Sequence, residues 1–185
     1  QAIRRAYAAM ITGIDDWVGK LVAEIERRGE MENTYIIFTS DHGEMLGDHG
    51  RWNKAIANEP SVHVPLVVAG PGIEAGTQCD ALVELIDLAA TITELAQLQV
   101  PEEWEARSIR KQLLEDPKAT HRDIQISALK DWKLIFDGQY KLVVTQEQPD
   151  QLYDLIADEN ECTNLAEQLP DVVAKLKARL EKEYA

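Results

Sequence analysis

Cysteine is scarce in this sequence, with 2 in 185 residues, and neither glycine (10) nor proline (7) is abundant. These low counts exclude a disulfide-stapled scaffold and a fibrous chain. Aromatic residues make up only 6%, yet hydrophobic residues as a whole reach 45%, too many for a disordered acidic tail. We expect a globular chain of one domain or two small ones, large enough to bury a core.

Long hydrophobic runs are also missing. No apolar stretch approaches the roughly 18 residues that a membrane-spanning helix needs, and the chain does not open on a positively charged and then apolar leader. No targeting signal is recognised, so the compartment stays open. Because the chain begins at Gln1, inside a helical pattern and without an initiator Met, we expect the natural N-terminus elsewhere and treat the sequence as a candidate fragment.

Positive charge is in short supply, because 19 Lys and Arg stand against 33 Asp and Glu, a formal net charge of −14. The acidic excess is spread over the whole chain. Such a field repels nucleic acid and anionic membrane, so neither is expected as a partner. An anionic substrate then requires a local cluster of metal, Lys or Arg.

Residues 1–98 alternate helical and extended patterns: a helix over 3–25 that ends near Gly29, strands over 35–39 and 65–69, and a helix over 87–96 with Asp87 as N-cap. Both strand runs are continuously apolar. Such runs are typical of strands covered on both faces, as in a parallel α/β sheet. We therefore predict α/β layers with a parallel sheet in this part of the chain.

Residues 99–185 show a different pattern, in which short extended segments predominate. A short helical turn is followed by brief strands over 123–128, 133–136, 140–145 and 151–155, and a final helix begins near Pro170. Asp137, Gly138 and Gln139 form a hairpin turn signal between two of these strands. The pattern predicts an antiparallel sheet with a packed C-terminal helix. His121, in the polar stretch before the strands, is expected at the surface.

The segment from Thr39 to Lys54 holds the residue types that carry chemistry. Asp41 and His42 follow the first strand directly, and ligands in open α/β sheets bind beyond the carboxyl ends of strands. An Asp oxygen suits Mg²⁺, Ca²⁺ or Mn²⁺, whereas an imidazole nitrogen suits Mn²⁺, Fe or Zn²⁺ better. Lys54, at the end of a glycine-bearing loop, can return a positive charge to the same place.

Several segments resemble the sulfatases of the alkaline-phosphatase-like superfamily, and together they cover nearly the whole chain. They are the stretch 37–50 followed by Trp52 and Lys54, the helix segment 14–19, Val62 to Leu66 with Pro71-Gly72, residues 83–91, where Ala90 stands in place of the usual proline, and 151–155 followed by Glu161 and 164–166. The short Ser40-Asp41-His42-Gly43 is shared with phosphodiesterases and phosphomutases of the superfamily. Lys54 and the C-terminal signature make the sulfatases the more specific match.

The resemblance implies a fold and a division of the chain. Residues 1–98 are expected to form the C-terminal portion of an alkaline-phosphatase-like α/β sandwich. Residues 99–185 are expected to form a small α+β subdomain with an antiparallel sheet and a packed C-terminal helix.

The resemblance also implies roles for single residues. Asp41 and His42 match metal ligands, and an Asp-His pair is found in choline-sulfatase-like and iduronate-sulfatase-like members. The family metal is usually Ca²⁺, but because one of the two matched ligands is a histidine, Mn²⁺ and Mg²⁺ remain alternatives. Lys54 matches the lysine that contacts the sulfate ester and offsets its charge, a catalytic and substrate-binding role. His49 is a weaker substrate-binding candidate, while a structural hydrogen bond is expected of His63.

The nucleophile of the family is a formylglycine made from a C/S-x-P/A-x-R motif, and neither Cys79 nor Cys162 lies in one. The resemblance therefore implies metal-dependent hydrolysis of a sulfated small molecule or sulfated glycan by a longer protein, with the formylglycine upstream and this chain alone inactive. Two alternatives stay open. One is a phosphonate monoester or phosphodiester hydrolase of the same superfamily, and the other is a non-catalytic binding or structural module.

Overall fold

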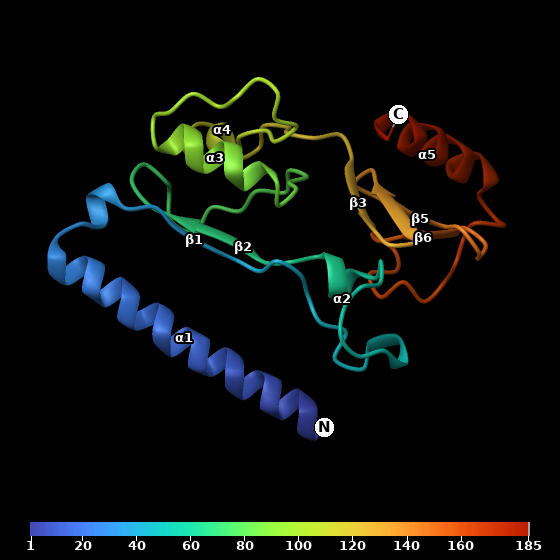
Figure 1. Ribbon diagram of the computed structural model, residues 1–185, viewed down its shortest axis with the longest axis horizontal. Helices are drawn as coiled ribbons and strands as arrows, with labels where there is room; N and C mark the ends of the chain where they lie inside the picture. The colour runs from blue at the N-terminus through green and yellow to red at the C-terminus, as the bar shows by residue number, and fades with distance from the viewer. Residues whose placement is uncertain (185) are drawn as a thin grey trace.

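The computed structural model describes residues 1–184 of the chain. Its elements follow one another in this order: α1 (Ala2–Arg28), η1 (Met31–Asn33), β1 (Ile36–Thr39), η2 (Asp48–Gly50), α2 (Glu59–Val62), β2 (Leu66–Ala69), α3 (Asp87–Leu95), α4 (Arg110–Leu114), β3 (Gln125–Leu129), β4 (Trp132–Phe136), β5 (Tyr140–Thr145), β6 (Gln151–Asp154) and α5 (Pro170–Glu183). Figure 1 shows α3 and α4 near the two-stranded sheet of β1 and β2, and α5 against the four-stranded sheet of β3 to β6. The α/β fold class is confirmed, while the division at residue 98 stays a prediction.

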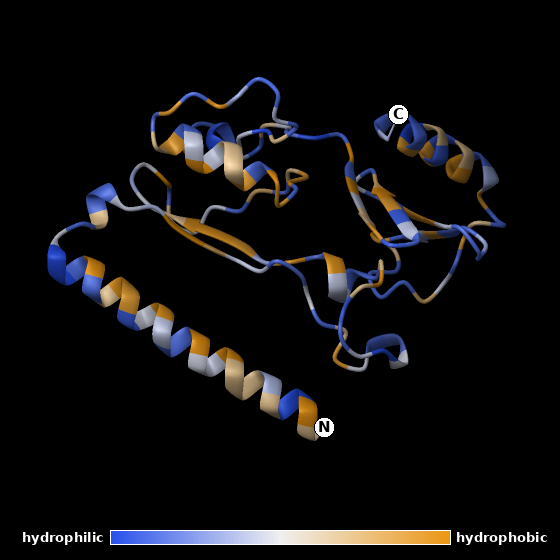
Figure 2. Ribbon diagram, in the orientation of Figure 1, coloured by the Kyte–Doolittle hydropathy of each residue, from blue (hydrophilic) through white to orange (hydrophobic). Residues whose placement is uncertain are grey.

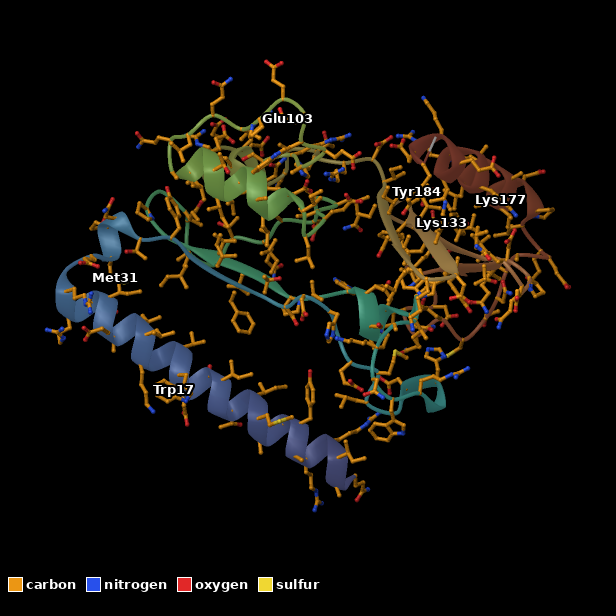
Figure 3. All side chains as sticks on the ribbon, in the orientation of Figure 1. Trp17, Met31, Glu103, Lys133, Lys177 and Tyr184 are labelled. Atoms are coloured by element: carbon orange, nitrogen blue, oxygen red, sulfur yellow. The ribbon has the colours of Figure 1, made fainter. Side chains whose placement is uncertain are left out.

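Helix α1 matches the helix predicted from the apolar spacing, and its end is set by Gly29. This glycine adopts a left-handed φ of 71°, and its N–H donates to the carbonyl oxygen of Glu26 at 2.9 Å. No side chain of α1 is buried, and Trp17 is 65% exposed. Figure 2 shows hydrophobic residues interspersed along α1, and Figure 3 labels the side chain of Trp17 on that helix. Despite its length of 27 residues, neither α1 nor any other helix within residues 1–184 is apolar enough to cross a membrane.

Strands β1 and β2 form an antiparallel pair in which Ile36 lies opposite Ala69 and Thr39 opposite Leu66. The parallel sheet predicted for this part of the chain is therefore wrong among the described residues. A continuous apolar run reports burial on both faces, but it carries no information about the direction of the neighbouring strand. The faces are also partly open, since Phe38 is 42% and Val67 59% exposed.

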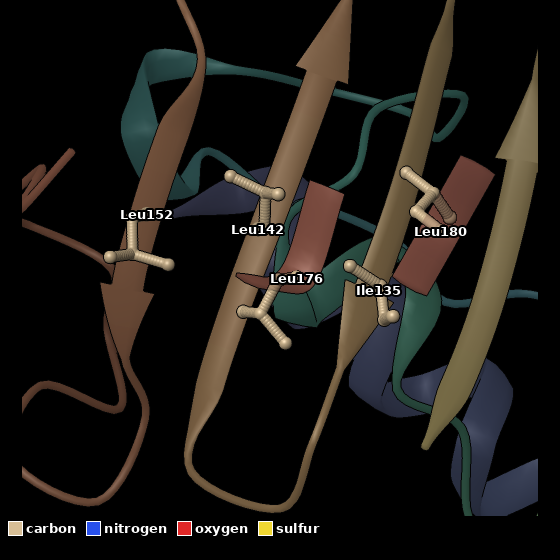
Figure 4. Close-up of a cluster of buried hydrophobic side chains, with 5 residues drawn as sticks. All are labelled: Ile135, Leu142, Leu152, Leu176 and Leu180. Atoms are coloured by element: carbon tan, nitrogen blue, oxygen red, sulfur yellow. The ribbon is translucent and has the colours of Figure 1, made fainter. Parts of the chain in front are cut away.

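The four-stranded antiparallel sheet runs in the order β3-β4-β5-β6 and carries α5, as predicted. Between β4 and β5, the Asp137 carboxylate accepts from the N–H of Tyr140 at 2.8 Å, and Gly138 has a φ of 96°. The core between sheet and helix consists of Ile135, Leu142, Leu152, Leu176 and Leu180 (Figure 4). Burying each such side chain contributes about 1.5–3 kcal/mol, so this core stabilises the C-terminal half.

Asp87 opens α3 but does not act as its N-cap, which corrects the sequence-based expectation. Its fully buried carboxylate accepts hydrogen bonds from Arg122 Nε at 2.8 Å, from the Arg107 N–H at 2.8 Å and from the Glu84 N–H at 3.0 Å. Burial opposes ionisation, but these hydrogen bonds, led by that of Arg122, outweigh it and lower the pKa of Asp87.

His121 lies in the same buried group of polar side chains as Asp87 and Arg122. Its Nε2 lies 3.1 Å from an Asp87 oxygen, and its side chain is only 6% exposed. The surface position predicted for His121 is therefore wrong. The pairing spans 34 residues of sequence, and the polar residues around His121 give no sign of it.

Candidate functional site

The loop that follows β1 carries the predicted chemistry, and its first turn is held tightly. Gly43 donates its N–H to the carbonyl oxygen of Ser61 at 2.8 Å. A Cβ at position 43 would overlap the carbonyl oxygen of Pro60, so only glycine allows this approach. Asp41 is fixed locally, because its Oδ1 accepts from the N–H of His42 at 3.0 Å.

Asp41, His42 and Lys54 come together at the end of β1. The Nε2 atom of His42 lies 3.5 Å from Oδ2 of Asp41, and the Nζ atom of Lys54 donates to the same Nε2. The structure thus brings together the three residues that the sequence spacing singled out. Their roles as metal ligands and catalytic lysine stay predictions.

The imidazole of His42 is oriented by the backbone. Its Nδ1 lies 2.8 Å from the carbonyl oxygen of Gly43, and a carbonyl can only accept. The proton is therefore assigned to Nδ1, which leaves the lone pair of Nε2 directed at Asp41 and Lys54. This is the tautomer that a metal-ligating histidine needs, with its second nitrogen donating to a carbonyl.

The donor set fits part of a metal shell. A carboxylate and an imidazole nitrogen within reach of each other suit Mn²⁺, while the carboxylate alone suits Ca²⁺ or Mg²⁺. Across residues 1–184, no group of three or more His, Cys, Asp or Glu side chains gathers in a way that could hold a metal. A metal at Asp41 and His42 would therefore take its further ligands from elsewhere.

The site is open to solvent. The Asp41 side chain is 84% exposed and that of His42 38% exposed. Both residues, with Lys54, line a broad cleft of about 2620 Å³ between the β1–β2 pair and the four-stranded sheet. A substrate could reach all three side chains from this cleft.

Contacts among its own residues help to hold the rest of the loop, together with Arg4 of α1, which donates to the carbonyl oxygen of Leu46 at 2.7 Å. Glu44 accepts from the N–H of Asn53 at 2.6 Å and from that of Leu46 at 3.2 Å. The Trp52 ring packs over Gly47, where an added Cβ would lie 3.2 Å from it. This packing agrees with a role of Trp52 as an anchor of its own loop.

The two other histidines near the site lie apart from the central three. His49 has a left-handed φ of 52° in η2, is exposed and does not line the cleft. Its proposed contact with substrate stays a prediction. His63 lines the cleft and pairs with Glu59 across 2.9 Å, the structural contact that was expected, and this pairing raises its pKa even though burial opposes the charge.

Sequence reasoning missed the residues that hold the segment after Lys54. The Trp132 indole donates from Nε1 to the carbonyl oxygen of Ala55 at 3.0 Å, and Lys141 donates from Nζ to that of Ala57 at 2.9 Å. Lys141 is buried in β5 beside Leu142. A lysine next to the apolar residues of a strand is a signal that could have pointed to it, but Lys133 of β4 has the same setting and is exposed.

Known relatives extend over most of the chain. Arylsulfatase K of Xenopus laevis is 31% identical over 96% of this chain, and choline-sulfatase of Rhizobium meliloti is 36% identical over 89%. The matched regions make up 36% and 33% of those proteins, so the chain spans about a third of the length of these curated relatives.

Solved structures share the fold. One is a protein in complex with its substrate D-glucosamine-2-N,6-O-disulfate, which aligns with a TM-score of 0.87 and 26% identity over 94% of this chain and 38% of that one. Another is the phosphonate monoester hydrolase of Agrobacterium radiobacter, with a TM-score of 0.82 and 27% identity over 95% of this chain and 40% of that one.

A family model described as Sulfatase matches residues 1–98, the part of the chain that contains Asp41, His42 and Lys54. The match covers more than half of the 185 residues. The family suggested by the sequence motifs is thereby confirmed, and the chain belongs to the sulfatase family.

Proposed function

We propose that this chain forms the C-terminal part of a sulfatase that hydrolyses a sulfate monoester with the help of a divalent metal. In this proposal Asp41 and His42 supply two of the metal ligands, and Lys54 contacts the ester. The observation that carries it is the convergence of Asp41 Oδ2, His42 Nε2 and Lys54 Nζ at the end of β1. Membership of the sulfatase family and the likeness to arylsulfatase K over 96% of this chain support the same assignment.

The chemistry asked of these residues is electrostatic. Hydrolysis adds water across the ester and releases an alcohol and sulfate, so negative charge develops on the leaving oxygen. The Lys54 ammonium is placed to offset that charge, a contribution that is largest where water is excluded. A bound divalent metal polarises the sulfate oxygens. The donor bond from His42 Nδ1 to Gly43 leaves Nε2 unprotonated, and a metal bound there would replace the Lys54 Nζ that donates to it in this structure.

The substrate class proposed is a sulfated small molecule or sulfated glycan. Its support is the substrate of the similar solved protein, a glucosamine that carries two sulfates. Local positive charge at Lys54 allows such an anion to bind despite the net charge of −14.

The nucleophile is proposed to come from outside these 185 residues. No Cys or Ser of the sequence lies in a C/S-x-P/A-x-R motif, from which the family makes formylglycine. The purified chain is therefore expected to show no turnover by itself.

The test compares the full-length protein with the isolated chain on an aryl sulfate in the presence of Ca²⁺ or Mn²⁺. We expect activity only in the full-length protein, and a loss of about 10²–10³-fold in kcat for Lys54→Ala. Retention of full activity in Lys54→Ala would remove Lys54 from the mechanism. Turnover by the isolated chain above that of its own Lys54→Ala variant would contradict the upstream nucleophile.

A second candidate is hydrolysis of a phosphonate monoester, favoured by the likeness to the phosphonate monoester hydrolase of Agrobacterium radiobacter. The same metal pair and lysine suit a phosphonate, because both esters present anionic oxygens to a cation. Assays with aryl sulfate and aryl phosphonate in parallel decide between them. A kcat/KM that is higher for the phosphonate would favour this second function.

A further inference from the structure

A buried lysine ties the four-stranded sheet to the segment that follows Lys54. Lys141, on β5, is only 1% exposed. Its Nζ donates to the carbonyl oxygen of Ala57 and to Oε1 of Glu59, each at 2.9 Å, and forms an ion pair with Glu161. Two protons of the ammonium are used in hydrogen bonds, and the ion pair with Glu161 compensates its charge inside the protein.

Glu161 completes the same contact from the other side. It is 3% exposed, and its Oε2 accepts from the N–H of Glu59 at 2.8 Å and from Nδ2 of Asn58 at 3.2 Å. Asn58 is the N-cap position of α2, so the carboxylate lies at the start of that helix. Two side chains from the C-terminal half therefore hold three consecutive residues, Ala57 to Glu59. We call Lys141 and Glu161 the charge clamp.

The held segment begins three residues after Lys54, and the two residues that flank Lys54 have a backbone conformation that is unfavourable in isolation. Asn53 and Ala55 have left-handed φ values of 68° and 76°, and alanine rarely adopts that region. The N–H of Asn53 is held by Glu44, while the carbonyl oxygen of Ala55 accepts from Trp132. Such a conformation persists only where its surroundings fix it from both sides.

We propose that the charge clamp positions Lys54, so that Lys141 and Glu161 are positioning residues for the site although neither touches it. This inference rests on the proposed function of Lys54 in sulfate ester hydrolysis. It assigns the C-terminal sheet a part in the chemistry, because β5 and the residues after β6 set where the Lys54 ammonium stands. The competing interpretation is that the clamp only stabilises the fold.

Trypsin cleavage of the full chain at the Lys54–Ala55 bond tests the structural half of the proposal, because cleavage requires local opening of that segment. The variants are Lys141→Met and the double variant Lys141→Met with Glu161→Gln. The double variant leaves no unpaired charge at positions 141 and 161, leaves Glu59 paired with His63, and keeps the acceptor for Asn58 and Glu59. The control is Lys177→Met, which removes a partly buried ion pair with Asp150 of 2.8 Å, away from the clamp.

We expect both clamp variants to be cut after Lys54 about tenfold faster than the wild type. In the same variants the rate of cleavage after Arg28 should change by less than about twofold. In Lys177→Met every cleavage rate should stay within about twofold of the wild type. Leu176→Ala, in the core under α5, provides a variant of lowered global stability with an intact clamp. The comparison is made with clamp variants whose thermal midpoint is lowered by the same amount. If Leu176→Ala accelerates cleavage after Lys54 as much as they do, the effect is global and the proposal is overturned.

A kinetic cycle in the full-length protein tests the functional half. Lys141→Met is expected to lower kcat about tenfold in the wild type and to have no further effect in the Lys54→Ala background, since positioning acts through Lys54. Equal losses in both backgrounds would overturn the positioning role. If the wild-type protein hydrolyses neither ester, the proposed function fails, and the trypsin comparison still decides whether the clamp holds Lys54.

Discussion

The imidazole of His42 donates from Nδ1 to the carbonyl oxygen of its neighbour Gly43 at 2.8 Å. This single bond makes Nε2 the acceptor nitrogen and directs it at Asp41 Oδ2, 3.5 Å away. Since Gly43 is itself fixed to Ser61 at 2.8 Å, the ring orientation depends on the packing of the loop against α2. The orientation of the ring is thus set by the backbone, and it is the orientation that the proposed metal site requires.

Metal binding by the 185-residue chain should depend on both proposed ligands, Asp41 and His42. We expect weak binding of Mn²⁺, because the described residues supply only two ligands, and a loss of about 10–100-fold in affinity for His42→Ala. Titration calorimetry with Mn²⁺ and Ca²⁺ measures it. His49→Ala, in the same loop, is the matched control, and an equal loss in that variant would contradict the assignment of His42.

Substituting Gly43 should destabilise the protein through overlap with the Pro60 carbonyl. We expect Gly43→Ala to lower the free energy of unfolding by about 1–3 kcal/mol, measured by urea denaturation. Gly13→Ala is the control, because nothing lies within 4 Å of its added Cβ in α1. That variant should be stabilised by about 0.5–1 kcal/mol. A neutral Gly43→Ala would mean that the turn relaxes without cost.

Asp87→Asn should remove one partner of a buried ion pair and leave Arg122 with its ion pair to Glu84, at 3.3 Å, as the remaining close compensation. The expected loss in the free energy of unfolding is about 3–5 kcal/mol at neutral pH. Because the pKa of Asp87 is lowered in the folded state, its stabilisation is present above the unfolded value of about 3.9 and is lost as the pH falls through the folded pKa. Urea denaturation between neutral and acidic pH measures this trend.

The control for Asp87 is Asp15→Asn, an exposed aspartate in α1. It should leave both the stability and its dependence on pH nearly unchanged. An Asp87→Asn variant that kept the acid sensitivity of the wild type would show that other carboxylates cause it.

Glu59 should also make the free energy of unfolding sensitive to acid. Burial opposes its ionisation, but the ion pairs with His63 and Lys141 outweigh it and lower the pKa of Glu59 to about 2. Its stabilisation is therefore present above the unfolded pKa of about 4.3 and is lost as the pH falls toward 2. Glu59→Gln should flatten the stability profile in that window. An unchanged profile would contradict the pairing with Lys141.

His63 should act with the opposite sign. Its pKa is raised by Glu59, so its stabilisation is fully present below the unfolded value of about 6.5 and is lost as the pH rises through the folded pKa. The side chain is 77% exposed, so we expect only about 0.2–1 kcal/mol for His63→Gln below neutral pH and almost none in alkaline solution. Thermal midpoints at the two pH values provide the measurement.

Much of the local structure was predictable from the residues. The spacing of apolar residues placed α1 and α5, and the Asp137-Gly138 turn placed the hairpin of β4 and β5. The position of Asp41 and His42 after a strand, with Lys54 at the end of the loop, also followed from sequence. These features depend on neighbours within a few turns of chain, which a periodic pattern records.

What the sequence by itself determined is therefore the strands and the longer helices, though not α2, η1 or η2, together with the family and the three candidate residues after β1. The tertiary structure alone decided that β1 and β2 run antiparallel, that Asp87 and His121 meet in the interior, and that Lys141 reaches Glu59 across 82 residues. Strand direction and buried charge depend on which distant segments meet. The energy of a buried ion depends on the partner it finds there, and no local pattern records that partner.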